Sequence, residues 1–274
     1  MRRLIAILLW VYLFIYVFAV PMLLFDLVPT WGSWMGGFLN MLLGCLMALW
    51  LYANAGRRGL LAAGCIVGLA GAVEYIGVTT GAPFGRYVYS DALGLKLDGA
   101  VPLPIPFAWL LVVPGALGAA QLAGVPWRWL SSAAALLALL FDLLLEPFAV
   151  YIMDYWRWLD RGPYYGVPTA NFIAWAVTGF VLAAITQALI GRSADRRTSA
   201  PEASPLIPTL LYLLNIVQFT LVDLVRGYTL AGLLGLLALL AGGLVLARNV
   251  DRASVMGRLS AVRLRATSSI ETEQ

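Results

Sequence analysis

Long apolar segments separated by short polar stretches run through almost the whole chain. Each segment is about as long as a helix that crosses the hydrocarbon core of a bilayer, roughly 20 residues. None has the short alternating pattern of a lipid-facing β-strand. We therefore expect an all-α, polytopic integral membrane bundle of about eight transmembrane helices, with seven as the alternative count. The segments cover residues 4–25, 34–54, 59–80, 104–123, 128–149, 171–191, 206–225 and 228–247.

The composition supports one membrane-embedded domain. Hydrophobic residues make up 62% of the chain and charged residues 12%, whereas a soluble domain carries about 25% charged residues. The polar residues that follow the last apolar segment are rich in arginine, then in Ser, Thr and Glu. We expect a single helical domain over 1–248 and a basic, polar cytoplasmic tail over 249–274, which lies on the lipid headgroups or is disordered.

The basic residues predict how the bundle is oriented in the membrane. Lys and Arg are enriched in cytoplasmic loops. With the N-terminus inside, only five of the 18 Lys and Arg residues fall on the outer side and the other thirteen on the inner side. Both termini are then cytoplasmic, and the protein is expected in a prokaryotic cytoplasmic membrane. The outer five are Arg86, Lys96, Arg157, Arg161 and Arg226.

What the chain lacks excludes several kinds of chemistry. It contains no histidine, which excludes His-ligated di-iron or haem sites and His-based acid–base catalysis. The two cysteines, Cys45 and Cys65, lie inside apolar segments and are interpreted as packing residues. No glycine-rich dinucleotide motif follows a strand, and the basic residues form no nucleic-acid surface. We expect no cofactor, no metal site and no nucleic-acid partner.

Acidic residues inside the apolar segments are the strongest indication of function, because a charge inside a bilayer costs several kcal/mol and usually marks a working site. Asp142 and Glu146 follow an uncharged run and lie four residues apart, on one face of a helix. Two such carboxyls do not both ionise readily, so one should keep its proton for general-acid chemistry. The alternative is a polar pair that holds helices together. Glu74 is a third acid, which can instead be a helix-end residue that reaches the headgroups.

Two loops on the outer side carry polar and aromatic residues. After Glu74, a Gly/Pro turn over 80–85 presents Arg86, Tyr87 and Tyr89, and this segment could fold over the bundle as a lid. The second loop is aromatic, and its rings either form an interfacial belt or line a pocket and face a developing carbocation. These rings are Tyr151, Tyr155, Trp156, Trp158, Tyr164 and Tyr165.

Two further polar positions have open interpretations. At the start of the sixth apolar segment, either Thr169 or Asn171 can cap the helix. Asn171 can also hydrogen-bond a catalytic carboxyl or a water molecule. Asp223 and Arg226, near the end of the seventh segment, are interpreted as a helix-end ion pair.

In combination, these motifs resemble the membrane carotenoid hydratase family, also described as carotenoid biosynthesis proteins. The resemblance covers about residues 74–180, and the flanking helices match in hydropathy only. The family often has Asp where this chain has Glu146, which keeps the carboxyl but moves it by one methylene. The matching pieces are Glu74 with Gly77, residues 80–89, Leu93-Gly94, Val101-Pro102 through Pro106, Trp109, Asp142-x-x-x-Glu146-Pro147, Trp156-x-Trp158, and 166–172 with Trp175.

The resemblance implies an enzyme, a hydro-lyase that adds water to the terminal C=C of an acyclic C40 or C50 carotenoid without a cofactor. Protonation of the less substituted carbon gives a tertiary cation, and water then adds to form a tertiary alcohol. We assign Asp142 or Glu146 as the proton donor and Glu74 as the group that orients or deprotonates the water. The expected substrate-binding residues are Arg86, Tyr87, Tyr89, Trp109, Trp156, Trp158, Asn171 and Trp175.

Two other functions remain open at this stage. A Mg²⁺-dependent membrane prenyltransferase would use paired acids to hold a metal-bound diphosphate, but it calls for a second acidic motif and more basic residues. A non-catalytic carotenoid-binding subunit would need the aromatic pocket and not the carboxyls. The sequence does not decide the oligomeric state or which carotenoid is the substrate.

Overall fold

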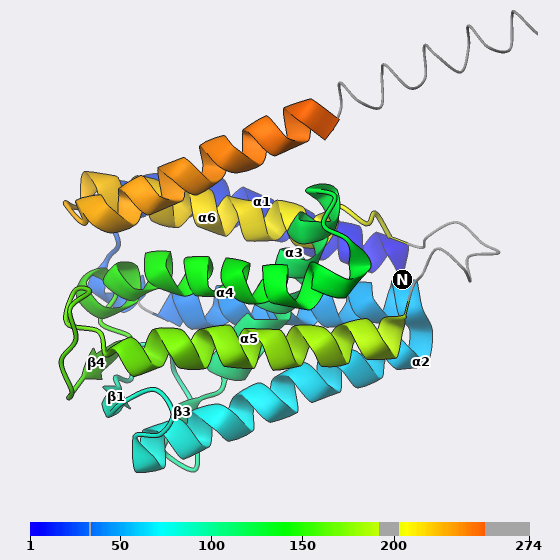
Figure 1. The fold of residues 1–274 in the computed structure, drawn as a ribbon. Helices are drawn as coiled ribbons and strands as arrows, with labels where there is room; N and C mark the ends of the chain where they lie inside the picture. The colour runs from blue at the N-terminus through cyan, green and yellow to red at the C-terminus, as the bar shows by residue number, and fades with distance from the viewer. Residues whose placement is uncertain (33, 192–202, 250–274) are drawn as a thin grey trace, which may run out of the picture.

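The apolar segments form the helices of a bundle, in nearly the predicted ranges (Figure 1). The computed structural model describes residues 1–32, 34–191 and 203–249. Within these residues, 7 helices are long and apolar enough to cross a membrane. The prediction of an all-α membrane bundle is therefore confirmed. The helices are α1 (Arg2–Leu24), α2 (Trp34–Thr80), α3 (Pro104–Leu122), α4 (Leu130–Pro147), α5 (Thr169–Ile190), α6 (Ile207–Val225) and a last helix, Thr229–Asn249.

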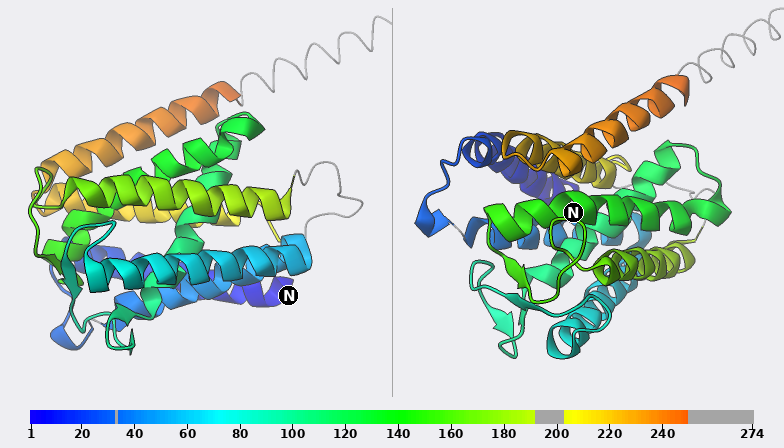
Figure 2. Two further views of the ribbon diagram at one scale, coloured as in Figure 1. Left: turned by 60° about the horizontal axis from the view of Figure 1, so that its bottom comes forward. Right: turned by 60° about the vertical axis from the view of Figure 1, so that its left-hand side comes forward.

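The long helix α2 is two membrane crossings joined by a tight turn. Gly56 has a non-helical backbone (φ 57°, ψ −136°), in a region that favours glycine. The chain turns back there, so that the two halves of α2 form a hairpin (Figures 1 and 2). The turn is close, because a Cβ atom on Gly59 would lie 1.9 Å from the carbonyl oxygen of Leu51. With α2 counted as two crossings, the described residues form the predicted eight. The last helix ends toward the same end of the bundle as the N-terminus (Figure 1).

Helix α3 lies at the centre of the bundle. Trp109 is 1% exposed, and the residues that follow it to Leu117 are all buried. A helix that is apolar and buried on all sides belongs in a core. Close packing against α6 depends on small residues, since a Cβ atom on Gly115 would lie 2.5 Å from Cβ of Tyr212.

The two long connections at the outer end of the bundle, between α2 and α3 and between α4 and α5, contain short β-strands. β1 (Tyr87–Tyr89) pairs antiparallel with β4 (Trp156–Trp158), and β2 (Lys96–Leu97) pairs with β3 (Val101–Pro102). These strands were not predicted, because two or three residues are too few to show a periodic pattern. The β1–β4 ribbon lies at the end of the bundle opposite the N-terminus (Figure 1). Three short helical turns complete the described fold: η1 (Thr30–Gly32), η2 (Trp127–Trp129) and a π-helical turn, η3 (Phe148–Ile152).

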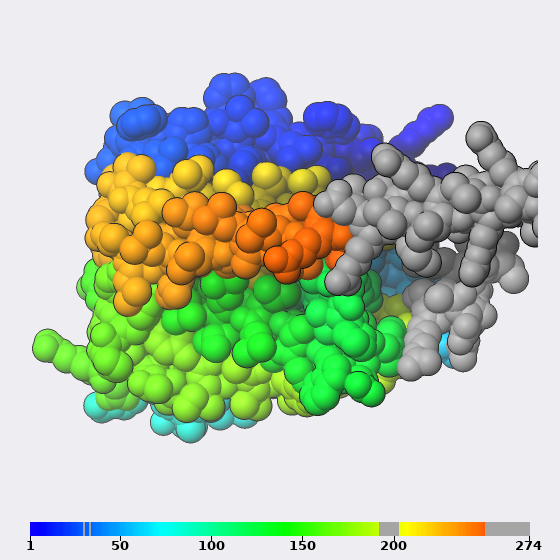
Figure 3. Space-filling model, turned by 45° about the horizontal axis from the view of Figure 1, so that its top comes forward, coloured from blue at the N-terminus to red at the C-terminus, as the bar shows by residue number. Residues whose placement is uncertain are grey.

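The last helix, Thr229–Asn249, packs along the outside of the bundle between α6 and α4 (Figure 3). Its apolar side chains are largely exposed, for example Leu237 at 63% and Leu244 at 62%, as expected for a helix that faces lipid. The tail predicted over 249–274 lies outside the described residues from position 250 on.

The predicted ion pair between Asp223 and Arg226 is wrong. Arg226 instead binds Asp26, with Nη2 and Oδ1 2.8 Å apart, and so joins the end of α6 to the end of α1. Asp223 is fully buried, and neither of its carboxyl oxygens has a hydrogen-bond partner among the described residues. Side chains at positions three apart near a helix end can pair with each other, but the neighbouring helix offers Arg226 a closer acceptor.

The orientation can be tested by cysteine labelling at the two ends of the bundle. With Cys45 and Cys65 replaced by serine, we expect Leu95→Cys, which is 82% exposed at the ribbon end, to react with a membrane-impermeant maleimide added outside cells. Arg58→Cys, in the exposed turn of α2, should react only after the membrane is opened. The opposite labelling pattern would reverse the topology.

Candidate active site

The β1–β4 ribbon directs four aromatic side chains toward the bundle. Side chains alternate between the two faces of a strand, so the middle residues of the two strands, Val88 and Arg157, point away and are exposed. The first and last residues of each strand share the other face. In register, Tyr87 is opposite Trp158 and Tyr89 is opposite Trp156.

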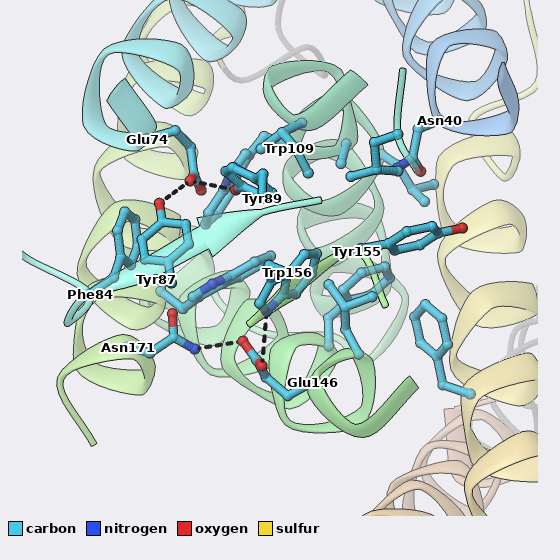
Figure 4. Close-up of a pocket in the computed structure, with 18 of the residues that line it drawn as sticks. Asn40, Glu74, Phe84, Tyr87, Tyr89, Trp109, Glu146, Tyr155, Trp156 and Asn171 are labelled. Atoms are coloured by element: carbon cyan, nitrogen blue, oxygen red, sulfur yellow. Dashed lines mark hydrogen bonds between the residues drawn. The ribbon is translucent and has the colours of Figure 1, made fainter. Parts of the chain in front are cut away.

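Glu74 accepts hydrogen bonds from both tyrosines of the ribbon. The hydroxyl groups of Tyr87 and Tyr89 donate to Oε2 of Glu74 over 2.7 and 2.9 Å (Figure 4). The glutamate is only 5% exposed, so it does not reach up to the headgroups. A Cβ atom on Gly77, one turn further along α2, would lie 2.5 Å from the ring of Phe84. The glycine lets the loop with Tyr87 and Tyr89 pack directly on the helix.

Glu146 accepts hydrogen bonds from both tryptophans of the ribbon and from α5. The indole N–H groups of Trp156 and Trp158 donate to Oε2 over 3.2 and 2.9 Å. Nδ2 of Asn171 donates to Oε1 of Glu146 over 3.1 Å and to Oδ2 of Asp142 over 2.8 Å. One amide thus links the two acids of α4. Of the two interpretations left open for Asn171, the structure shows the hydrogen bonds to carboxyls and no side-chain cap hydrogen bond at the start of α5.

A cavity of about 80 Å³ lies between these two carboxylates, and we call it the carboxylate cavity. Its polar wall contains Glu74, Glu146 and Asn171, and it has room for more than one water molecule. Much of the remaining wall is aromatic, including Trp109 and Trp175, whose rings stack with centroids 4.3 Å apart. Figure 4 shows the acids on opposite sides of the ribbon aromatics. Also in the wall are Tyr87, Tyr89, Trp156 and Trp158.

The two ribbon tyrosines are held in their neutral, hydrogen-donating form. Burial, followed by the nearby Glu74 carboxyl, raises the pKa of Tyr87 and of Tyr89 well above the usual value for a phenol. Burial likewise raises the pKa of Tyr155, at the edge of the ribbon. The hydroxyl groups of Tyr87 and Tyr89 therefore keep their protons and donate to Glu74 at all physiological pH values.

Two of the expected site residues lie away from the cavity wall. Arg86 is 68% exposed and forms an ion pair with Asp160, with Nη2 and Oδ1 2.7 Å apart. This hydrogen bond lowers the pKa of Asp160. The ion pair connects the two outer loops, so Arg86 holds these loops together. Asp142 is fully buried behind Asn171, and its Oδ1 atom has no hydrogen-bond partner among the described residues. Of the α4 pair, Glu146 is the carboxyl in the cavity wall.

Some rings of the aromatic loop line a pocket, and others lie at the surface as an interfacial belt would. Tyr155, Trp156 and Trp158 line the carboxylate cavity, whereas Tyr151 is 52% exposed and its hydroxyl donates to the carbonyl of Tyr165 over 2.6 Å. Some rings thus belong to a pocket, and others lie at the bundle surface as an aromatic belt would.

Several wall residues were not identified from the sequence. Asn40 and Asn215 each lie inside an apolar segment and reach the cavity wall. A polar residue in such a segment is a signal that can be found in advance. Phe141 and Phe219 carry no such signal, since phenylalanine is common in membrane helices.

The comparisons with known proteins agree on one family. The model of the family described as "Carotenoid biosynthesis protein" matches residues 35–241. The bisanhydrobacterioruberin hydratase of Haloarcula japonica is 36% identical over 117 residues. That alignment covers 40% of this chain and 38% of the relative, so the chain matches well under half of the relative's length. No solved structure matches.

The amide bridge can be tested through stability. Asn171→Leu removes a donor shared by two buried carboxyls, and we expect a loss of about 1–3 kcal/mol in the free energy of unfolding, measured in detergent. In an Asp142→Leu background the same change should cost less, because one of the two acceptors is gone. If the losses in unfolding free energy caused by Asn171→Leu and Asp142→Leu are simply additive, Asn171 does not couple the two acids.

Proposed function

The chain belongs to the carotenoid biosynthesis protein family, and on this basis we propose that it hydrates the terminal C=C of an acyclic carotenoid end group. The observation that supports this most directly is the pair of buried carboxyl groups, Glu74 and Glu146, in the wall of one aromatic cavity. The relative of 36% identity is named a hydratase, of bisanhydrobacterioruberin. The proposed location is the cytoplasmic membrane of a prokaryotic cell.

The first step is proton transfer from Glu146 to the less substituted carbon of the alkene. A trisubstituted alkene is a weak base, so the donor must be stabilised once it has lost its proton. Three N–H groups already point at Glu146, from Trp156, Trp158 and Asn171. Preorganised donors of this kind stabilise charge as it develops in the transition state. Asp142 shares the Asn171 amide with Glu146. Because two neighbouring carboxyls do not both ionise readily, this closeness favours a protonated Glu146 before the reaction.

The second step is capture of the tertiary cation by water. The faces of aromatic rings attract cations, and Tyr87, Trp109 and Trp175 line the cavity between the two acids. Glu74 accepts the proton that the water loses, while the hydroxyl groups of Tyr87 and Tyr89 hold its carboxyl in place. The alkene gains one hydrogen and one hydroxyl group. Glu74 then releases to solvent the proton it took from the water, and solvent returns a proton to Glu146, so both carboxyls regain their starting states.

Carboxyl substitution tests the acid–base roles. Glu146→Gln and Glu74→Gln keep size and hydrogen bonding, and we expect each to lower hydration by about 10²–10⁴-fold. The assay is mass analysis of pigments from cells that accumulate lycopene, in which one added water raises the mass by about 18 units. Asp154→Asn is the matched control, because this acid pairs with Arg157 at the surface.

The result also separates an enzyme from a carotenoid-binding subunit. If both glutamine variants fold, bind carotenoid and support normal levels of hydrated product, the carboxyls are structural. If instead the wild type binds carotenoid but yields no hydrated product, a binding subunit, which needs only the aromatic wall, is the better description.

Chelation distinguishes hydration from Mg²⁺-dependent prenyl transfer. Among the described residues, no three Asp, Glu or Cys side chains are grouped so that they could hold a metal ion, and proton transfer from Glu146 requires none. We expect product formation in membranes to be unchanged by EDTA. Activity lost in EDTA and restored by Mg²⁺ would favour the prenyltransferase.

A further inference from the structure

A second, larger cavity adjoins the carboxylate cavity. It has a volume of about 350 Å³, within the range of ligand pockets, about 300–1,000 Å³. Its walls come from α1, the first half of α2 and α6, and we call it the α1 groove. The two cavities share part of their lining: Asn40, Leu145, Tyr155, Asn215 and Phe219.

The α1 groove is apolar and its rim faces the lipid. None of the described residues that line it is charged. On α1 the lining includes Phe14 and Phe18, which are 67% and 58% exposed, and at the membrane-surface end it includes Trp31, which is 72% exposed. Since these side chains lie in or next to a membrane-spanning helix, the groove opens toward the acyl chains of the bilayer.

Tyr155 stands at the junction of the two cavities. In Figure 4 its hydroxyl points away from Glu146, toward the side on which α6 lies. A Cβ atom on Gly36 would lie 1.7 Å from that hydroxyl oxygen, so the ring reaches α2 only because residue 36 is glycine. Asn215 lies at the same junction, and its amide donates to the hydroxyl of Tyr12 over 3.1 Å.

We propose that the α1 groove holds the long polyene chain of the substrate while the end group reaches Glu146. This inference takes its ligand from the proposed function. A cavity of about 80 Å³ is far too small for a 40-carbon chain, so most of the chain must lie outside the carboxylate cavity. The adjoining groove shares part of its wall with the carboxylate cavity, and none of its described lining residues is charged. The junction at Tyr155 then sets how far the end group can enter.

Substitutions that place a large side chain in the α1 groove test whether it binds the polyene. Ala19→Trp and Leu39→Trp place an indole in the groove from its two walls, on α1 and α2. The matched controls place the same indole on the lipid-facing side of those helices: Val17→Trp, at a position 63% exposed, and Phe38→Trp, at 44%. The full-length proteins are purified from lycopene-accumulating cells, and retained carotenoid, hydrated product and bound lipid are measured by mass analysis. Thermal unfolding in detergent shows that each variant is folded.

We expect Ala19→Trp and Leu39→Trp to retain at least about tenfold less carotenoid, equivalent to about 1.4 kcal/mol of binding, and to lose product to the same extent. Val17→Trp and Phe38→Trp should keep both. Glu146→Gln should keep the carotenoid and lose only the product, which separates binding from chemistry.

Other outcomes distinguish the groove from the proposed function. If folded Ala19→Trp and Leu39→Trp retain carotenoid and product at wild-type levels, the groove does not hold the polyene. Phospholipid displaced from these variants with carotenoid unchanged would make it a lipid site and overturn the inference. If the wild type binds carotenoid without hydrating it, and the groove variants lose that carotenoid, the groove assignment stands while the hydratase function fails.

Discussion

A carboxyl group buried in a membrane protein needs hydrogen-bond donors, and the outer half of this molecule is organised around that need. Glu74 and Glu146 are 5% and 1% exposed, where an unsatisfied polar group costs several kcal/mol. The bundle helices alone do not supply enough donors, because their backbone N–H groups are used within the helices. The donors come from the β1–β4 ribbon and from Asn171 at the start of α5. The loops therefore have to fold back onto the bundle.

This arrangement couples the two acids mechanically. The tyrosines of one strand bind Glu74, and the tryptophans of the other bind Glu146. Because backbone pairing fixes the strands to each other, the separation of the two carboxyls is fixed by the ribbon. The surface ion pair of Arg86 with Asp160 holds the same two loops from outside. Such a scaffold suits a reaction in which one group gives a proton and another receives one across a small cavity.

The sequence predicted the helices well and the site only in part, for a physical reason. Membrane helices follow from local hydropathy, so their ranges agree with the structure to within a few residues. The three acids stood out because each interrupts an apolar segment. The pairing of Tyr87 with Trp158 joins positions 71 residues apart, through strands too short to show a pattern. Without that pairing, Arg86 could not be separated from its neighbours Tyr87 and Tyr89, although it faces the opposite way. Nor could four-residue spacing show that Glu146 reaches the cavity while Asp142 lies behind Asn171.

The size of the carboxylate cavity has a consequence for the whole bundle. Chemistry on a carbocation needs a small, dry space that excludes all but the reacting water, and the wall of stacked and buried rings provides it. A long apolar substrate needs the opposite, an open path from the lipid. One closed bundle cannot meet both needs at the same point. In this fold they are separated: the second half of α2, α3, α4 and α5 enclose the acids together with the ribbon, while α1 and the first half of α2 leave a groove that opens to lipid. Tyr155 and Gly36 mark the boundary between the two. In the proposed binding mode, the polyene stays in an apolar environment and only its end group reaches the acids.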